Sequence, residues 1–127
     1  MAQKIYIAGK VSGEDYDKVI IKFATKHAEL EAKGYKVINP VERLLEFNDN
    51  LRKTGDKPLS EEKDRTKILK IGIQWLLDCD AIYMLEDWTQ SEGATMEHQI
   101  ADTMGLEIQY ENDFKISFTD YGNYRQG

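Results

Sequence analysis

The chain has 127 residues, 41% hydrophobic and 31% charged, a composition typical of one globular domain with a single core. Seventeen basic against 23 acidic residues give a net charge of −6 without a basic block, which argues against a nucleic-acid polymer as a partner. No apolar run approaches the roughly 20 residues that span a bilayer, so we expect a cytoplasmic protein with no membrane partner.

The first part of the chain predicts a strand, a helix and a second strand. Residues 5–8 are a short apolar run, and residues 35–38 are another, which Asn39-Pro40 stops. Between them, residues 14–33 have helical spacing, and two strands joined by one helix in this length should be parallel. The apolar side of the helix is expected to carry Val19, Phe23, Ala24, His27 and Leu30.

The second part of the chain predicts two further strands, each reached through a helix. Alternation of strands and helices predicts an α/β fold, an open parallel sheet with helices on both faces. We expect one domain over residues 1–110, whereas residues 111–127 match neither period and form a tail or an arm. In chain order, we expect a polar loop at 48–64, a helix from near Ser60 to about Asp78, a strand at 81–85, a helix ended by Gly105 and a strand at 107–110.

Two features of the second part bear on assembly and on metal binding. The helix that ends near Asp78 has more apolar residues than one core-facing stripe requires, which suggests contact with a second subunit and hence a homodimer or higher homo-oligomer. The lone Cys79 is expected to be a small buried side chain, His27 packed and His98 exposed. These residues make no metal site, and we expect no cofactor.

In an open parallel sheet, ligands bind outside the carboxyl ends of the strands, so the segments that follow residues 8 and 85 are the candidate site. The first segment reads AGKVSG and supplies Gly9, Lys10, Ser12 and Gly13. Its glycines permit a tight turn and a close approach of backbone to a ligand, but their spacing fits neither the dinucleotide fingerprint nor the P-loop. Alone, it is compatible with an ordinary turn.

The second segment, DWTQSEGATME, places a carboxylate inside a helix that begins beside the same crevice. Ser91 is a candidate cap, as is a capping box of Thr89 and Glu92, and Gly93 exposes N–H groups at the positive helix end, which favours an anion. Glu97 shares a helical stripe with Ile100, Ala101 and Met104. A carboxylate there loses water, so it either hydrogen-bonds within the core edge or takes part in chemistry.

Other residues near the strand ends have two interpretations each. Tyr6 is a core tyrosine or a partner for a carboxylate at the crevice. Asp87 either contacts a ligand or is solvated, and Trp88 either stacks on a base or packs against the helix start. Asp80 opens its strand at the opposite edge of the sheet and is expected to be structural.

Three segments, IYIAG, GYKVINP and CDAIYMLEDWTQSEGATMEHQIA, together resemble the DUF4406 family within the nucleoside 2-deoxyribosyltransferase-like superfamily. The resemblance covers roughly residues 4–110 and is most specific in W-x-x-S-x-G-A-x-x-E. It implies a flavodoxin-like sheet of five strands, of which four are predicted above, and sites near subunit contacts. It also implies that Glu97 is the nucleophile that attacks C1′ of a deoxyribonucleoside and that Tyr6 orients it.

The resemblance further implies a substrate class. Transferases of the superfamily carry an aspartate six residues before the nucleophile, whereas relatives that hydrolyse deoxynucleoside 5′-monophosphates carry a serine, as this chain does at Ser91. In those relatives the loop that corresponds to Gly9–Gly13 also holds the 5′-phosphate. The pattern therefore favours an N-glycosidase acting on a nucleotide, over a nucleoside 2-deoxyribosyltransferase.

Gly72 departs from the pattern, because active relatives have an aspartate there that assists departure of the base. General acid catalysis is typically worth about 10²–10⁴-fold. Asp87 or Glu92 would have to replace that acid, or the protein binds a nucleotide without cleaving it. The expected partner is therefore a small-molecule nucleotide or nucleoside, and a non-catalytic nucleotide-binding or sensing module is the alternative to an enzyme.

Overall fold

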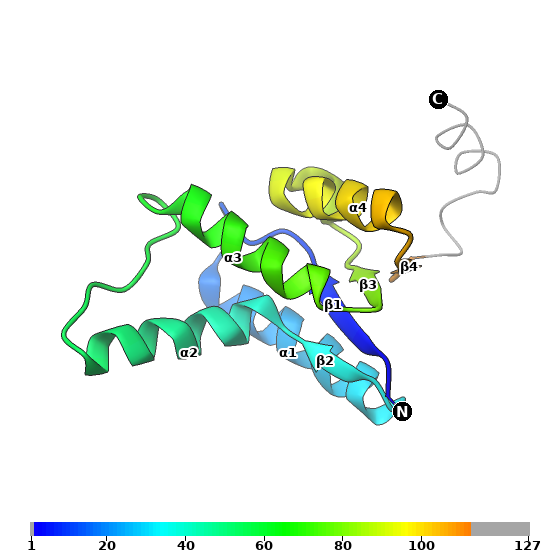
Figure 1. Ribbon diagram of the computed structural model, residues 1–127, viewed down its shortest axis with the longest axis horizontal. Coiled ribbons are helices and arrows are strands. Elements are labelled where there is room, and N and C mark those ends of the chain that lie inside the picture. The colour runs from blue at the N-terminus through cyan, green and yellow to red at the C-terminus, as the bar shows by residue number, and fades with distance from the viewer. Residues whose placement is uncertain (1, 113–127) are drawn as a thin grey trace.

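Parallel strands form one open sheet in the computed structural model, which describes residues 2–112 (Figure 1). Within these residues the strand order is β2-β1-β3-β4, the order of the first four strands of a flavodoxin-like sheet. The predicted open parallel α/β fold is thus confirmed. A fifth strand in residues 113–127 would lie outside the described residues. The strands are β1 (Lys4–Ala8), β2 (Lys36–Ile38), β3 (Ala81–Met84) and β4 (Glu107–Tyr110).

Helices cover both faces of this sheet, as predicted. Successive residues of β1 point to opposite faces, so Ile5 and Ile7 pack with α1 in one cluster while Tyr6 and Ala8 pack under α3 and α4 in the other. Figure 1 shows the strands between α1 on one side and α4 on the other. The helices are α1 (Tyr16–Ala32), α2 (Pro40–Lys53), α3 (Arg65–Leu77) and α4 (Glu92–Met104), with a short 3-10 helix, η1 (Trp88–Gln90).

Helix α2 was not predicted, and the expected loop at 48–64 is wrong over its first six residues, which belong to this helix. Asn39-Pro40 does stop β2, but it also starts α2 at once. The Asn39 side chain accepts hydrogen bonds from the N–H groups of Val41 and Glu42, and proline is well suited to a first helical position.

The segment after α2 is tied down by one buried side chain. Asn48 accepts a hydrogen bond of 2.7 Å from the Leu59 N–H and donates one of 3.0 Å to the Leu59 carbonyl. Ser60 begins a turn and not a helix, so α3 starts at Arg65, five residues later than expected from the sequence.

Three expectations about side-chain burial are wrong. Ala24 is exposed on α1, and Met104, the last residue of α4, is 62% exposed. His98 was expected to be exposed but is only 2% exposed, since it packs between Trp88 and β4. Its ring stacks on Trp88 at 4.4 Å between centroids, and its Nε2 lies 2.7 Å from the Tyr110 hydroxyl.

Other local expectations are confirmed. Cys79 is buried, Gly105 ends α4 in the left-handed region with φ of 75°, and the Asp80 carboxylate binds the Lys4 N–H at the amino end of the sheet. Among residues 2–112, no helix has both the length and the apolar character needed to cross a membrane.

Candidate functional site

A cavity of about 470 Å³ lies at the carboxyl end of β1. Its wall is built from the end of β1, the β1–α1 loop, the first halves of α1, α2 and α4, and one face of α3. The sheet grows from β1 toward β2 on one side and toward β3 on the other, which is the switch point where open α/β sheets bind ligands. The volume is in the range of small-molecule sites, roughly 300–1,000 Å³.

Tyr6 and Glu97 meet in the wall of this cavity. The Tyr6 hydroxyl donates a hydrogen bond of 2.5 Å to Glu97 Oε2, and the two side chains are 2% and 8% exposed. The expected burial of Glu97 is confirmed. Burial raises the pKa of Glu97 to about 7, and the hydrogen bond from Tyr6 partly opposes this rise. Near neutral pH the group therefore occurs both as a carboxylate and as an acid.

Gly72 on α3 packs directly against this pair. A Cβ atom added to Gly72 would lie 3.1 Å from the Tyr6 hydroxyl oxygen and 3.4 Å from Glu97 Oε2. Any side chain here must displace the hydroxyl by a few tenths of an ångström. The close approach of helix α3 thus favours glycine at this position, which places no acidic side chain beside Glu97 from this point of the helix.

The start of α4 presents polar groups to the cavity. Ser91 is the N-cap: its Oγ accepts a 3.1 Å hydrogen bond from the Ala94 N–H, so Ser91, and not the alternative box of Thr89 and Glu92, caps the helix. The Ser91 hydroxyl keeps its own hydrogen as a donor. Gly93 allows close packing, since a Cβ there would lie 3.1 Å from Leu69 Cδ2.

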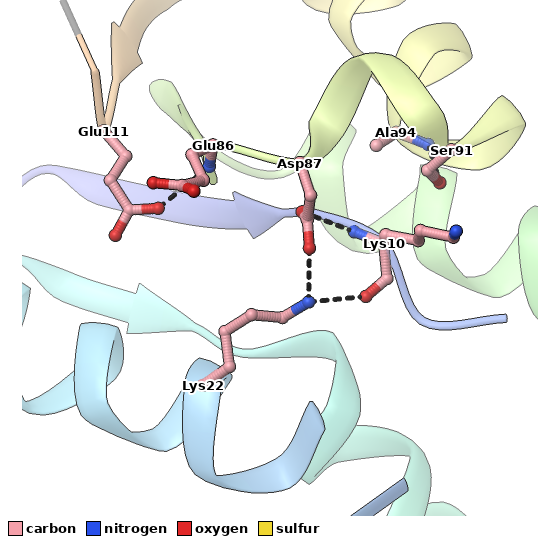
Figure 2. Close-up of polar contacts among 7 residues, drawn as sticks. All are labelled: Lys10, Lys22, Glu86, Asp87, Ser91, Ala94 and Glu111. Atoms are coloured by element: carbon pink, nitrogen blue, oxygen red, sulfur yellow. Dashed lines mark hydrogen bonds and ion pairs between the residues drawn. The ribbon is translucent and has the colours of Figure 1, made fainter. Parts of the chain in front are cut away.

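One ion pair, between Asp87 and Lys22, holds the β1–α1 loop through both backbone polar groups of Lys10 (Figure 2). Asp87 accepts a 3.0 Å hydrogen bond from the Lys10 N–H and pairs with the Lys22 ammonium at 2.6 Å, and Lys22 also donates to the Lys10 carbonyl at 2.9 Å. In Figure 2 the Lys10 side chain extends away from this cluster, on the side where Ser91 lies. The Lys10 N–H is therefore already bound, while its side chain lines the cavity.

Glycine is needed at two positions of the loop for two different physical reasons. A Cβ on Gly9 would lie 2.6 Å from Leu85 Cδ1, so Gly9 allows the end of β1 to pack against the residue after β3. Gly13 has a φ of 79°, a conformation that L-residues with side chains rarely adopt.

The structure brings most of the predicted site residues to one cavity and leaves three outside its wall. Gly13 lies farther along the loop, Asp87 is engaged with Lys22, and Trp88 stacks on His98. The sequence left two roles open for Trp88, stacking on a base or packing against the start of α4. Its position against α4 fits the packing role. The predicted residues that line the cavity are Tyr6, Gly9, Lys10, Ser12, Ser91, Gly93 and Glu97.

Sequence reasoning missed Arg65, Glu61 and Lys22. Arg65 lines the cavity and forms an ion pair with Glu92 that joins the starts of α3 and α4 on the exposed side. Glu61 accepts a 3.4 Å hydrogen bond from the Ser12 hydroxyl. Arg65 is the first residue of α3. Because the helix was predicted to begin near Ser60, Arg65 was expected inside the helix and not at its end.

Comparison with known proteins identifies a family. No curated protein matches the chain. Among the described residues, no group of three or more His, Cys, Asp or Glu side chains is placed to hold a metal ion. A family model described as a domain of unknown function, DUF4406, matches residues 3–110, which include every strand described above. The chain therefore belongs to the DUF4406 family.

Proposed function

We propose that this protein is an N-glycosidase of the nucleoside 2-deoxyribosyltransferase-like superfamily that hydrolyses the base–sugar bond of a (deoxy)nucleoside 5′-monophosphate. One observation carries the proposal. Glu97 is buried, held by the Tyr6 hydroxyl, and lines a cavity that also contains Lys10 and the capped start of α4. A carboxylate with little water and a single hydrogen-bond donor is a reactive nucleophile.

In this mechanism Glu97 attacks C1′ of the sugar and displaces the base. The negative charge of its carboxylate stabilises the oxocarbenium-like transition state, and the product is a glycosyl ester of Glu97. Water then attacks C1′ and releases the sugar phosphate. Tyr6 restricts Glu97 to one orientation, and a pKa of about 7 keeps a substantial carboxylate fraction at neutral pH.

The phosphate would bind at the polar end of the cavity. The start of α4 carries a partial positive charge, and Ser91 retains a hydroxyl hydrogen for a phosphate oxygen. Lys10 lines the same cavity. Arg65 can leave its ion pair with the exposed Glu92 carboxylate and bind a phosphate in its place.

The alternative to hydrolysis is a module that binds a nucleotide without cleaving it, and Gly72 favours this alternative. Asp87, one of the two acids considered as a substitute, lies outside the cavity wall and binds Lys22. Glu92 lines the cavity but is paired with Arg65. A third possibility, transfer of the sugar to a second base, uses the same Glu97 ester and differs only in the acceptor.

The test is to incubate the protein with each deoxynucleoside 5′-monophosphate and to measure free base by chromatography. We expect base release by the wild type and loss of release in Glu97→Gln, which keeps the shape of the side chain. Exposed Glu46→Gln on α2 is the matched control and should retain activity. Binding by calorimetry with intact nucleotide recovered after hours would select the non-catalytic module. Base exchange with added free base would select the transferase.

We also propose that the protein is a homodimer or a larger homo-oligomer. The outer face of α3 ends in Leu77, which is 50% exposed, and Met104 is an exposed apolar residue of α4, the helix that contacts α3. Light scattering at micromolar concentration should give at least twice the chain mass of 14.7 kDa. A monomeric mass would refute this proposal.

A further inference from the structure

The wall of the cavity is polar at one end and apolar along α2 and α3. Polar groups come from the β1–α1 loop and from the starts of α3 and α4, where Lys10, Arg65 and Ser91 lie. Beyond Arg65, α3 contributes apolar residues and Gly72, and α2 contributes apolar residues alone. These apolar wall residues are Pro40, Val41, Leu44, Ile68, Leu69 and Trp75.

The three carboxyl groups that line the cavity, those of Glu61, Glu92 and Glu97, are already engaged, so none of them is free as a proton donor for a leaving base. Tyr6 donates its hydroxyl hydrogen to Glu97, and Gly72 occupies the point on α3 that faces this pair. At the exposed side, Glu92 is paired with Arg65. Glu61 accepts a hydrogen bond from Ser12. A neutral base that departs without protonation becomes an anion, which is a poor leaving group.

We propose that the preferred leaving group is a base with a fixed positive charge on its glycosidic nitrogen, as in a pyridinium nucleotide; this inference rests on the proposed N-glycosidase function. The carboxylate of Glu97 forms a bond to C1′ while the C–N bond breaks. The electron pair of that bond goes to the ring nitrogen, and the base leaves neutral without receiving a proton. Water then attacks C1′, which regenerates Glu97 and releases one proton and the sugar phosphate.

The charge of such a base also suits the environment of Glu97. Among the described residues, this buried carboxyl accepts a hydrogen bond from the neutral Tyr6 hydroxyl. A buried carboxylate without a cation is costly, and burial accordingly raises its pKa. A pyridinium ring beside Glu97 would supply the missing positive charge and would increase the carboxylate fraction at neutral pH.

The apolar wall suits a ring with few polar groups at its edge. A neutral purine or pyrimidine carries several ring and exocyclic donors and acceptors, and an apolar wall would leave some of them without partners, which weakens binding. The pyridinium ring of nicotinamide has no ring donors or acceptors, and a carboxamide is its one polar substituent. Trp75 on α3 adds apolar surface to this wall, and the Arg43 guanidinium already lies over its ring, 5.8 Å from the centroid.

The experiment compares nicotinamide mononucleotide with AMP and dAMP at equal concentration, with free base measured by chromatography. We expect kcat/KM for nicotinamide release to exceed that for adenine release by at least about 100-fold, the smallest factor usually assigned to a general acid. The pH profile for nicotinamide release should rise as Glu97 ionises and then stay level. Glu97→Gln should abolish release, and Glu46→Gln should not.

The outcomes separate this inference from the proposed function. Equal or faster adenine release, or a fall in nicotinamide release at alkaline pH that reveals a required acid, overturns the inference and leaves the N-glycosidase proposal standing. Absence of base release from all three nucleotides and from the deoxynucleoside monophosphates overturns both. A preference for nicotinamide mononucleotide with a level alkaline limb supports both.

Discussion

The Tyr6 hydroxyl donates a hydrogen bond of 2.5 Å to Glu97, although 91 positions separate the two residues in the chain. Tyr6 lies on β1 and Glu97 on α4, so the bond joins the centre of the sheet to the helix that covers it. Because burial and this bond act on the Glu97 pKa in opposite directions, the pair sets the pH range in which Glu97 is ionised.

Replacing Tyr6 with Phe should raise the pKa of Glu97 further above 7, because the lowering hydrogen bond is lost while burial remains. The midpoint of the rise in base release with pH, where Glu97 ionises, should move up by roughly one pH unit, which corresponds to loss of one hydrogen bond to a charged group. Tyr83→Phe, on β3 and facing the other helix layer, is the matched control. An unchanged midpoint in Tyr6→Phe would show that the bond does not control ionisation.

Stability should depend on pH through Glu97. The folded-state pKa of about 7 lies above the ordinary value of 4.5, so the folded protein binds more protons between these pH values. The free energy of unfolding should therefore decrease as pH rises from about 4.5 to about 7, by roughly 3 kcal/mol in total, and then level off.

Urea denaturation of wild type and Glu97→Gln from pH 5 to pH 8 isolates this contribution. Glutamine does not titrate, so the stability of the variant relative to wild type should increase as pH rises. Parallel stability curves for the two proteins would exclude a raised pKa at Glu97.

Lys22 should act as a positioning residue for the β1–α1 loop. Lys22→Met removes the ammonium that joins Asp87 to the Lys10 carbonyl, and loosening of the loop should raise KM for a nucleotide about tenfold with a smaller change in kcat. Lys22→Arg should restore much of the affinity, because the charge and donors remain. Exposed Lys18→Met on α1 controls for loss of charge. Equal KM values in Lys22→Met and wild type would refute the positioning role.

Arg65 should distinguish nucleotides from nucleosides. Arg65→Ala should raise KM for a monophosphate by roughly tenfold, about the value of one exposed charge-assisted contact, and leave cleavage of the corresponding nucleoside unchanged. Glu92→Gln releases Arg65 from its ion pair and should lower KM for the monophosphate. Lys67→Ala, exposed on the same helix, is the control. If both substrates respond equally to Arg65→Ala, Arg65 does not contact the phosphate.

Local patterns in the sequence were sufficient for much of the fold. Short apolar runs followed by glycine or Asn-Pro predicted the strands, because a strand buried on both faces needs apolar residues in succession. Helical spacing predicted that Glu97 would be buried, and Gly105 marked the end of α4 through its left-handed conformation. Helix α2 was missed because its N-cap signal coincides with the end of β2 and its sequence is mostly polar.

The composition of the candidate site depended on the tertiary structure. Periodicity states which side of a helix is buried, but it does not state which partner that side meets, since partners lie far apart in the chain. His98 is buried because β4 and Trp88 pack over it, and Lys22 reaches Asp87 across 65 positions. The sequence by itself determined the strands, the Gly105 end of α4 and the burial of Glu97, because these follow from neighbouring residues. Only the fold decided that Gly72 faces Tyr6 and Glu97 and that Arg65 joins their cavity, because helix packing sets those contacts.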